Sequence, residues 1–210
     1  MPLTYHHKTH QLQLGIWKSS ESMEELEQLA GLRESEIRMV QSFKSELRKK
    51  EFLSVRALLH NLHPTSSLVI QYDENGKPYL DNMLSLSISH TQDYVSVLFS
   101  PLPYVGLDLE TIRPQIEKIA HKFVNDEEAN YIDEKNRRQH LHILWGAKEV
   151  LYKIYGKGNV DFRGHLYVAP FKCADKGTTE ATIRMPDFER TFLIHFERTE
   201  NRMLAYATGE

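Results

Sequence analysis

The chain has 210 residues, with 26 Lys and Arg against 29 Asp and Glu, and a formal net charge of −3 at pH 7. This length suits one large domain or two small ones, and the slightly acidic balance gives no reason to expect nucleic acid or an anionic membrane as partner. No apolar run approaches the length of a membrane span, and the first residues lack the apolar core of a signal peptide. The lone Cys173 excludes an internal disulfide, so we expect a cytoplasmic protein with no membrane contact.

The first half of the chain is predicted to alternate between strands and helices. Leu12, Leu14 and Ile16 alternate within residues 1–18, which favours one N-terminal strand. Helices are then expected from the capping box of Ser22 and Glu25, and over Ser35–Ser42 and Ser45–Leu62. The polar turn Asp73–Pro78 and strands over Leu84–His90 and Tyr94–Ser100 follow.

The helix expected over Ser45–Leu62 is basic in its first half. Its apolar positions are predicted to face a core: Leu47, Phe52, Val55, Leu58 and Leu59. Its cations are Arg48, Lys49, Lys50 and Arg56. For any single one of these, a solvated basic face is the ordinary interpretation. Taken together, they form a plausible grip for the phosphates of a nucleotide.

Ser89 and His90 offer a hydroxyl and an imidazole at the end of a predicted strand. Adjacent strand residues point to opposite faces, so a nucleophile–base contact between them is not expected. Either group can instead bind a phosphate.

The stretch Tyr104–Glu110 is predicted to be a strand with an acidic face. Val105, Leu107 and Leu109 alternate with Gly106, Asp108 and Glu110. Two carboxylates on one strand face repel each other and favour a cation or a proton between them. Gly106 leaves room for a ligand to approach the backbone. An edge strand with a solvated acidic face would show the same pattern.

A helix expected over Leu141–Tyr155 supplies the next charged groups, because Glu149 lies 149 − 108 = 41 residues after Asp108. Leu144, Ala147, Leu151 and Ile154 form its buried stripe, and Trp145, Glu149 and Lys153 share a neighbouring face. Further helices are predicted over Gln115–Phe123 and Asp126–Lys135, with a loop over Asn136–Gln139. Strands are predicted over Leu166–Lys172, Thr179–Met185, Thr191–Glu197 and Met203–Thr208. Propensity alone supports an α+β fold.

Two motifs at this separation resemble the paired signature of 4′-phosphopantetheinyl transferases, and most closely the larger, surfactin-synthetase-activating type. They are Val-Gly-Leu-Asp-Leu-Glu at 105–110 and Trp-Gly-Ala-Lys-Glu-Val-Leu-Tyr-Lys at 145–153. The resemblance extends to Gly76-Lys77-Pro78 and Ser87–His90, and covers roughly residues 43–160. Leu107 and Val150 depart from the commonest residues of the pattern, and both remain apolar.

The resemblance implies two similar α/β halves related by a pseudo-twofold axis, over residues 1–103 and 104–210, with the active site in the cleft between them. Coenzyme A would bind there, and its phosphopantetheine would pass to a serine of an apo-acyl or peptidyl carrier protein. Adenosine 3′,5′-bisphosphate would be released. Because one chain carries both halves, we expect a monomer.

The resemblance also implies roles for particular residues. Mg²⁺, or Mn²⁺ in its place, would be held by Asp108, Glu110 and Glu149. Coenzyme A would contact Lys50, Lys77, Ser89, His90, Lys148 and Lys153. The catalytic group would comprise Asp108, Glu149 and Lys153, with Glu149 as general base, metal ligand or both.

Two other functions fit part of this pattern. A metal-dependent nuclease uses similar carboxylates, but the net acidity and the absence of a basic stripe disfavour it. A non-catalytic coenzyme A-binding module would not need three carboxylates and two lysines. Carrier docking is predicted on the segment after Glu110, where Arg113, Lys118 and Lys122 alternate with apolar residues. An ordinary amphipathic helix with core-facing Ile and Phe would look the same.

Overall fold

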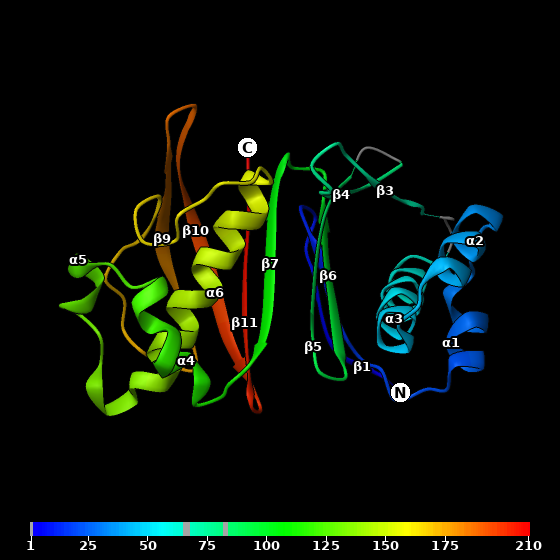
Figure 1. Cartoon of the computed structure of the whole chain (residues 1–210), viewed down its shortest axis with the longest axis horizontal. Coiled ribbons are helices and arrows are strands. Elements are labelled where there is room, and N and C mark those ends of the chain that lie inside the picture. The colour runs from blue at the N-terminus through cyan, green and yellow to red at the C-terminus, as the bar shows by residue number, and fades with distance from the viewer. Residues whose placement is uncertain (1, 65–67, 82–83) are drawn as a thin grey trace.

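The computed structural model describes residues 2–64, 68–81 and 84–210, and within them two antiparallel sheets face each other in the middle of the molecule (Figure 1). The first sheet has the order β1 (Leu3–Lys8), β2 (Gln13–Lys18), β6 (Tyr94–Ser100), β5 (Ser85–Thr91), β4 (Pro78–Leu80) and β3 (Ile70–Tyr72). The second has the order β7 (Tyr104–Thr111), β11 (Arg202–Gly209), β10 (Phe188–Thr199), β9 (Lys176–Met185) and β8 (Leu166–Val168). Antiparallel sheets with separate helices make this an α+β fold, as predicted.

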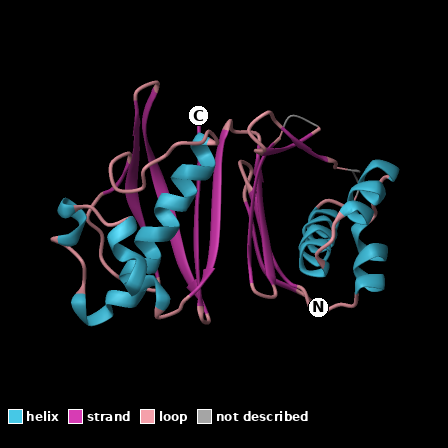
Figure 2. Ribbon diagram, viewed as in Figure 1, coloured by secondary structure: helices cyan, strands magenta, loops and turns pink. Residues whose placement is uncertain are grey.

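Helices cover the outer side of each sheet (Figure 2). The first sheet carries α1 (Met23–Ala30), α2 (Glu34–Ser42) and α3 (Glu46–Leu62). The second carries α4 (Gln115–Ile119), α5 (Asp126–Ala129) and α6 (Arg137–Tyr155). Each helical layer closes its own apolar core, and a third core lies between the sheets. The order strands, helices, strands therefore occurs twice, which confirms the expected two-halved architecture. The sheets change over between β6 and β7; the division into domains at 103/104 stays a prediction.

Helix starts follow the side chains that cap them. Ser22 accepts from the main-chain N–H of Glu25 and opens α1 with a capping box, and Ser45 accepts from Arg48 to open α3. These caps satisfy donors that have no partner within the helix. The capping box of Ser22 and Glu25, predicted from the sequence, is confirmed.

Several expectations about local structure are wrong. The loop expected over Asn136–Gln139 is helical from Arg137, and the strand expected over Leu166–Lys172 ends at Val168. Residues 1–18 form the hairpin of β1 and β2, because the Thr9 hydroxyl accepts from Gln11 and Leu12 and turns the chain. The helix expected over Asp126–Lys135 ends at Ala129. Asp133 then accepts from the N–H groups of Lys135 and Asn136, so a short 3-10 turn leads into α6. Leu47 was expected in the core but is 62% exposed at the start of α3.

Among the described residues, no helix combines the length and apolarity that crossing a membrane requires.

Candidate active site

Strand β7 directs its carboxylates toward helix α6, as the alternation predicted. Val105, Leu107 and Leu109 lie in the core between the sheets, whereas the other face of β7 meets α6. An added Cβ on Gly106 would lie 2.4 Å from the main-chain oxygen of Val150. The missing side chain of Gly106 therefore allows the close approach of α6. The expectation that it makes room for a ligand is wrong.

Asp108 is the centre of the polar cluster and is only 3% exposed. Its Oδ1 accepts from Lys153 Nζ at 2.9 Å and from the Ser89 hydroxyl at 3.1 Å. Lys153 also donates to the main-chain oxygen of Leu107 at 2.7 Å. The Oδ2 atom of Asp108 is buried without a hydrogen-bond partner. A buried carboxylate oxygen in that state is costly and indicates a site that a cation can complete.

The negative charge of Asp108 acts on both Glu110 and Glu149. Burial, then the charges of Asp108 and Glu149, raises the pKa of Glu110 from 4.5 to about 7. Burial, then the charge of Asp108, raises the pKa of Glu149 to about 7, while Lys153 opposes both shifts. The structure thus brings together Asp108, Glu110, Glu149 and Lys153, the four groups that the sequence assigned to one site. Raised pKa values of this kind cluster at functional sites.

The donor set suits a hard divalent cation, because it consists of carboxylate oxygens with one oxygen unpartnered. Within residues 2–64, 68–81 and 84–210, however, no three His, Cys, Asp or Glu side chains are gathered as a ready-made metal site. Lys153 already neutralises part of the charge of Asp108. Mg²⁺ is commonly held by one or two carboxylates together with substrate phosphates, so the residues fit a cation that arrives with its substrate.

Side-chain hydroxyls join the two sheets at this point. Strand β7 is an edge strand, and its N–H groups at Leu107, Leu109 and Thr111 point toward β5. They donate respectively to the hydroxyls of Ser87, Ser89 and Thr91. We call these three residues the hydroxyl ladder. The sequence predicted that Ser89 binds a phosphate; instead it is buried in this ladder and orients Asp108.

A cleft leads from the first half to Lys153, one member of this cluster. Its outer part, about 500 Å³, is lined by α2, α3, the β3–β4 hairpin and β5, and includes Arg48, Arg56 and His90. Its inner part, about 220 Å³, is lined by the hairpin and β5 on one side and by Tyr152, Lys153 and Gly156 on the other. Both parts share Gly76, Pro78 and Ile88 as lining. The predicted cleft between the halves is therefore present, and its volumes suit a nucleotide-sized ligand.

The outer part of the cleft contains two of the four cations predicted on α3, Arg48 and Arg56, together with the acidic Glu51. Arg56 is buried, donates to Glu36 at 2.6 Å and lies over the ring of Phe52. Its Nη2 is buried with no partner. Lys50 is half-buried and does not line the cavity as far as the chain is described. Arg56 lies one helical turn after Phe52 and one before Leu59, and its ion pair with Glu36 of α2 holds it inward.

His90 and Lys77 do reach the cleft. His90 is half-exposed, and its Nδ1 lies 3.2 Å from Glu51. It points away from the face that carries Ser89, as strand geometry predicted. Lys77 donates through Nζ to the main-chain oxygen of Ile154 at 2.7 Å, across the cleft.

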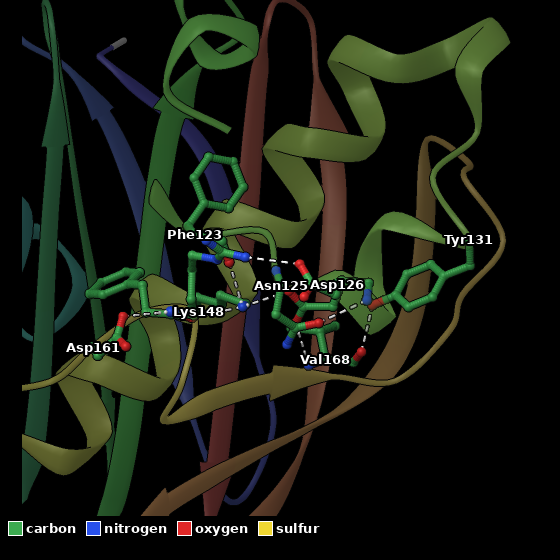
Figure 3. A network of polar contacts seen from close by, with 10 residues as sticks. Phe123, Asn125, Asp126, Tyr131, Lys148, Asp161 and Val168 are labelled. Carbon is green, nitrogen blue, oxygen red and sulfur yellow. Dashed lines mark hydrogen bonds and ion pairs between the residues drawn. The ribbon is translucent and has the colours of Figure 1, made fainter. Parts of the chain in front are cut away.

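Lys148 does not join the site, which corrects its prediction as a phosphate ligand. Its side chain is fully buried and donates to the main-chain oxygens of Phe123 and Phe162 and to Glu128 Oε2, at 2.6, 2.8 and 2.7 Å (Figure 3). All three ammonium protons are therefore used. Glu128 Oε1 also accepts from Val168, so this pair ties α6 to the segments on its far side. Glu128 is a partner of Lys148 that was not predicted from the sequence, although Asn125 and Glu128 form a visible capping box.

Comparison with known proteins decides the family. The sequence model of the 4′-phosphopantetheinyl transferase superfamily matches residues 104–207. Residues 104–207 of the chain therefore belong to this superfamily. Among curated relatives, it is 32% identical over 98 residues to 4′-phosphopantetheinyl transferase gsp of Aneurinibacillus migulanus, covering 45% of this chain and 41% of that protein. It is 32% identical over 117 residues to 4′-phosphopantetheinyl transferase AcpT of Escherichia coli O157:H7, covering 52% of this chain and 59% of that protein.

The match to the superfamily covers the half of the chain that carries Asp108, Glu110, Glu149 and Lys153. The matched stretches span about half the length of these curated relatives. The first half, which lines most of the outer cleft, is outside the matched superfamily region. The first half is assigned to the site because its residues line the cleft.

The segment after β7 does not present the apolar docking surface that the sequence left open. Ile116 and Phe123 are buried in the core beneath α6. Ile116 and Phe123 therefore serve packing, while Arg113, Lys118 and Lys122 are exposed.

Proposed function

We propose that this protein transfers the 4′-phosphopantetheine group of coenzyme A to a serine of an apo-carrier protein. The observation that carries the proposal is the cluster of Asp108, Glu110, Glu149 and Lys153, of which Lys153 lines the inner part of the cleft. The names of the curated relatives, which are 4′-phosphopantetheinyl transferases, support the same reaction. Adenosine 3′,5′-bisphosphate is the second product.

Coenzyme A would lie along the cleft with its adenosine end outward. Arg48 and Arg56 line the outer part and supply positive charge there. His90 lines the same space. The pyrophosphate would then lie in the inner part, beside Lys153.

The transfer reaction needs a general base and a cation that stabilises developing negative charge, both close to the reacting phosphorus. Glu149, with its pKa raised to about 7, is suited to take the proton of the attacking serine hydroxyl near neutral pH. The serine oxygen forms a bond to the phosphorus next to the pantetheine arm, and the bond from that phosphorus to the bridging oxygen breaks. Lys153 is placed to offset negative charge that develops on the leaving phosphate.

A divalent cation, Mg²⁺ or Mn²⁺, would be held by Asp108 with Glu110 and Glu149, and would supply Lewis-acid stabilisation of the pyrophosphate oxygens. The buried, unpartnered Oδ2 of Asp108 supports this assignment. Because both sides of the cleft come from one chain, a single chain supplies every residue named here, which supports action as a monomer.

The direct test incubates the protein with coenzyme A, Mg²⁺ and a panel of apo-acyl and apo-peptidyl carriers, and reads each carrier by intact mass. A gain of one phosphopantetheine on at least one carrier is expected. Asp108→Ala should lower turnover by orders of magnitude while the far-ultraviolet circular dichroism stays unchanged, because it removes the central acceptor of the cluster. No gain on any carrier, or near-normal turnover of Asp108→Ala at limiting Mg²⁺, overturns the proposal.

A further inference from the structure

Lys77 makes a contact that its place in a substrate cleft does not require. It belongs to the turn between β3 and β4 in the first half, and its Nζ donates to the main-chain oxygen of Ile154, 2.7 Å away in the last turn of α6. The last carbonyls of a helix have no partner inside it, and a cation there also meets the negative end of the helix dipole. The contact therefore satisfies a group that α6 leaves free.

Both ends of this contact are built for it. Asp73 Oδ1 accepts from the N–H groups of Asn75 and Lys77, which fixes the turn that carries Lys77. On the other side, Gly156 ends α6 with φ +70°, a conformation that favours glycine. An added Cβ on Gly156 would lie 2.6 Å from Lys77 Cδ, so the aliphatic stem of Lys77 lies directly over this glycine.

The turn of α6 that Lys77 holds is the one that carries the site. Lys153 immediately precedes Ile154, and Glu149 lies one helical turn before Lys153. Lys153 is itself bonded to Asp108 and to the main-chain oxygen of Leu107 in β7. The end of α6 is thus anchored to the second half through Lys153 and to the first half through Lys77.

We propose that Lys77 is a positioning residue, whose ammonium group fastens the β3–β4 turn to the end of α6 and so holds Lys153 and Glu149 in register with Asp108. This proposal rests on the proposed transferase function and deepens it. Lys77 acts through α6 on the reacting groups, in contrast to a residue that only grips coenzyme A.

The first test is Lys77→Met, which keeps the stem and removes the ammonium group. We expect kcat at saturating coenzyme A and carrier to fall about tenfold to a hundredfold, the range for one hydrogen bond to a charged group. The Kd of coenzyme A, measured by calorimetry without carrier, should change less than about threefold. The matched control is Lys157→Met, because Lys157 is exposed and pairs with Asp187 within the second half; it should keep kcat. Unchanged kcat in Lys77→Met, or a loss confined to the Kd of coenzyme A, overturns the proposal.

The second test needs neither turnover nor carrier. Gly156→Ala should lower the melting temperature, and the loss should be smaller by about 2 °C or more in a Lys77→Ala background, where the stem no longer meets the added methyl group. Equal losses in both backgrounds would show that Lys77 does not rest on Gly156, and would overturn the proposal. This double-mutant cycle decides the contact even if the wild-type protein modifies no carrier, so a failure of the proposed function remains distinguishable.

Discussion

Replacing Lys148 by Met should destabilise the protein severely, although Lys148 is buried away from the proposed substrate site. The substitution keeps the buried stem but removes the cation that faces Glu128, and both side chains have no solvent exposure. Two main-chain oxygens, those of Phe123 and Phe162, lose their donor as well. Leaving one partner of a buried ion pair charged and alone costs about 3–5 kcal/mol of unfolding free energy. Domains are stable by only about 5–15 kcal/mol, so this is a large fraction.

The assay is urea unfolding at pH 7, followed by tryptophan fluorescence; Trp145 lies in α6 and stacks on Phe162, so it reports on this region. For a chain of this size, the expected loss corresponds to a melting temperature lower by about 6–20 °C. Adding Glu128→Gln should recover part of the loss, because the amide is neutral and still accepts from the N–H of Val168. The exposed pair of Lys157 gives the control: Lys157→Met should change stability by less than about 1 kcal/mol.

One result would refute this reasoning. If Lys148→Met stayed within about 0.5 kcal/mol of the wild type while turnover collapsed, Lys148 would have to leave its buried position and act at the substrate, as the sequence first suggested.

Three further predictions follow from the site. Gly106→Ala should cost about 1–3 kcal/mol of stability, measured by urea unfolding, because the new methyl group meets the main-chain oxygen of Val150; an unchanged midpoint would contradict the packing. Glu149 has its pKa raised to about 7 in the folded state, so its stability contribution is complete below pH 4.5 and lost as the pH rises through 7. Mg²⁺ should therefore raise the melting temperature more at pH 8 than at pH 5, and equal gains would exclude these carboxylates as ligands. Lys118→Glu with Lys122→Glu should raise the carrier KM and flatten the salt dependence of kcat/KM, while the coenzyme A KM stays constant; an unchanged carrier KM would move docking elsewhere.

The carboxylate face of β7 was predictable because a strand has a period of two. The alternation of Val105, Leu107 and Leu109 fixed which residues enter the core, and thus put Asp108 and Glu110 on the face toward α6. The same reasoning placed Glu149 and Lys153 together on α6. In both cases a local period determines the direction of the side chain, and local periods are visible in one sequence.

Lys148 shows where motif reasoning replaced geometry. At 100° per residue, it lies about 140° around the helix from Lys153 and about 40° from Leu144, so the period of α6 already placed it near the buried stripe. Lys148 was nevertheless assigned to the site because it precedes Glu149 directly in the motif. Ser89 is a different case. Its burial depends on β5 meeting the edge of β7 from the other sheet, a long-range contact that no local pattern encodes.

The hydroxyl ladder has a consequence for fragments of this protein. It satisfies the free N–H groups of β7 without making β5 a neighbouring strand in the same sheet. A fragment that begins at Tyr104 would expose this edge, together with the apolar face of Leu107 and Leu109. Bare edges of that kind pair with strands of other molecules. The isolated second half should therefore self-associate, and the first half acts as its built-in protection against aggregation.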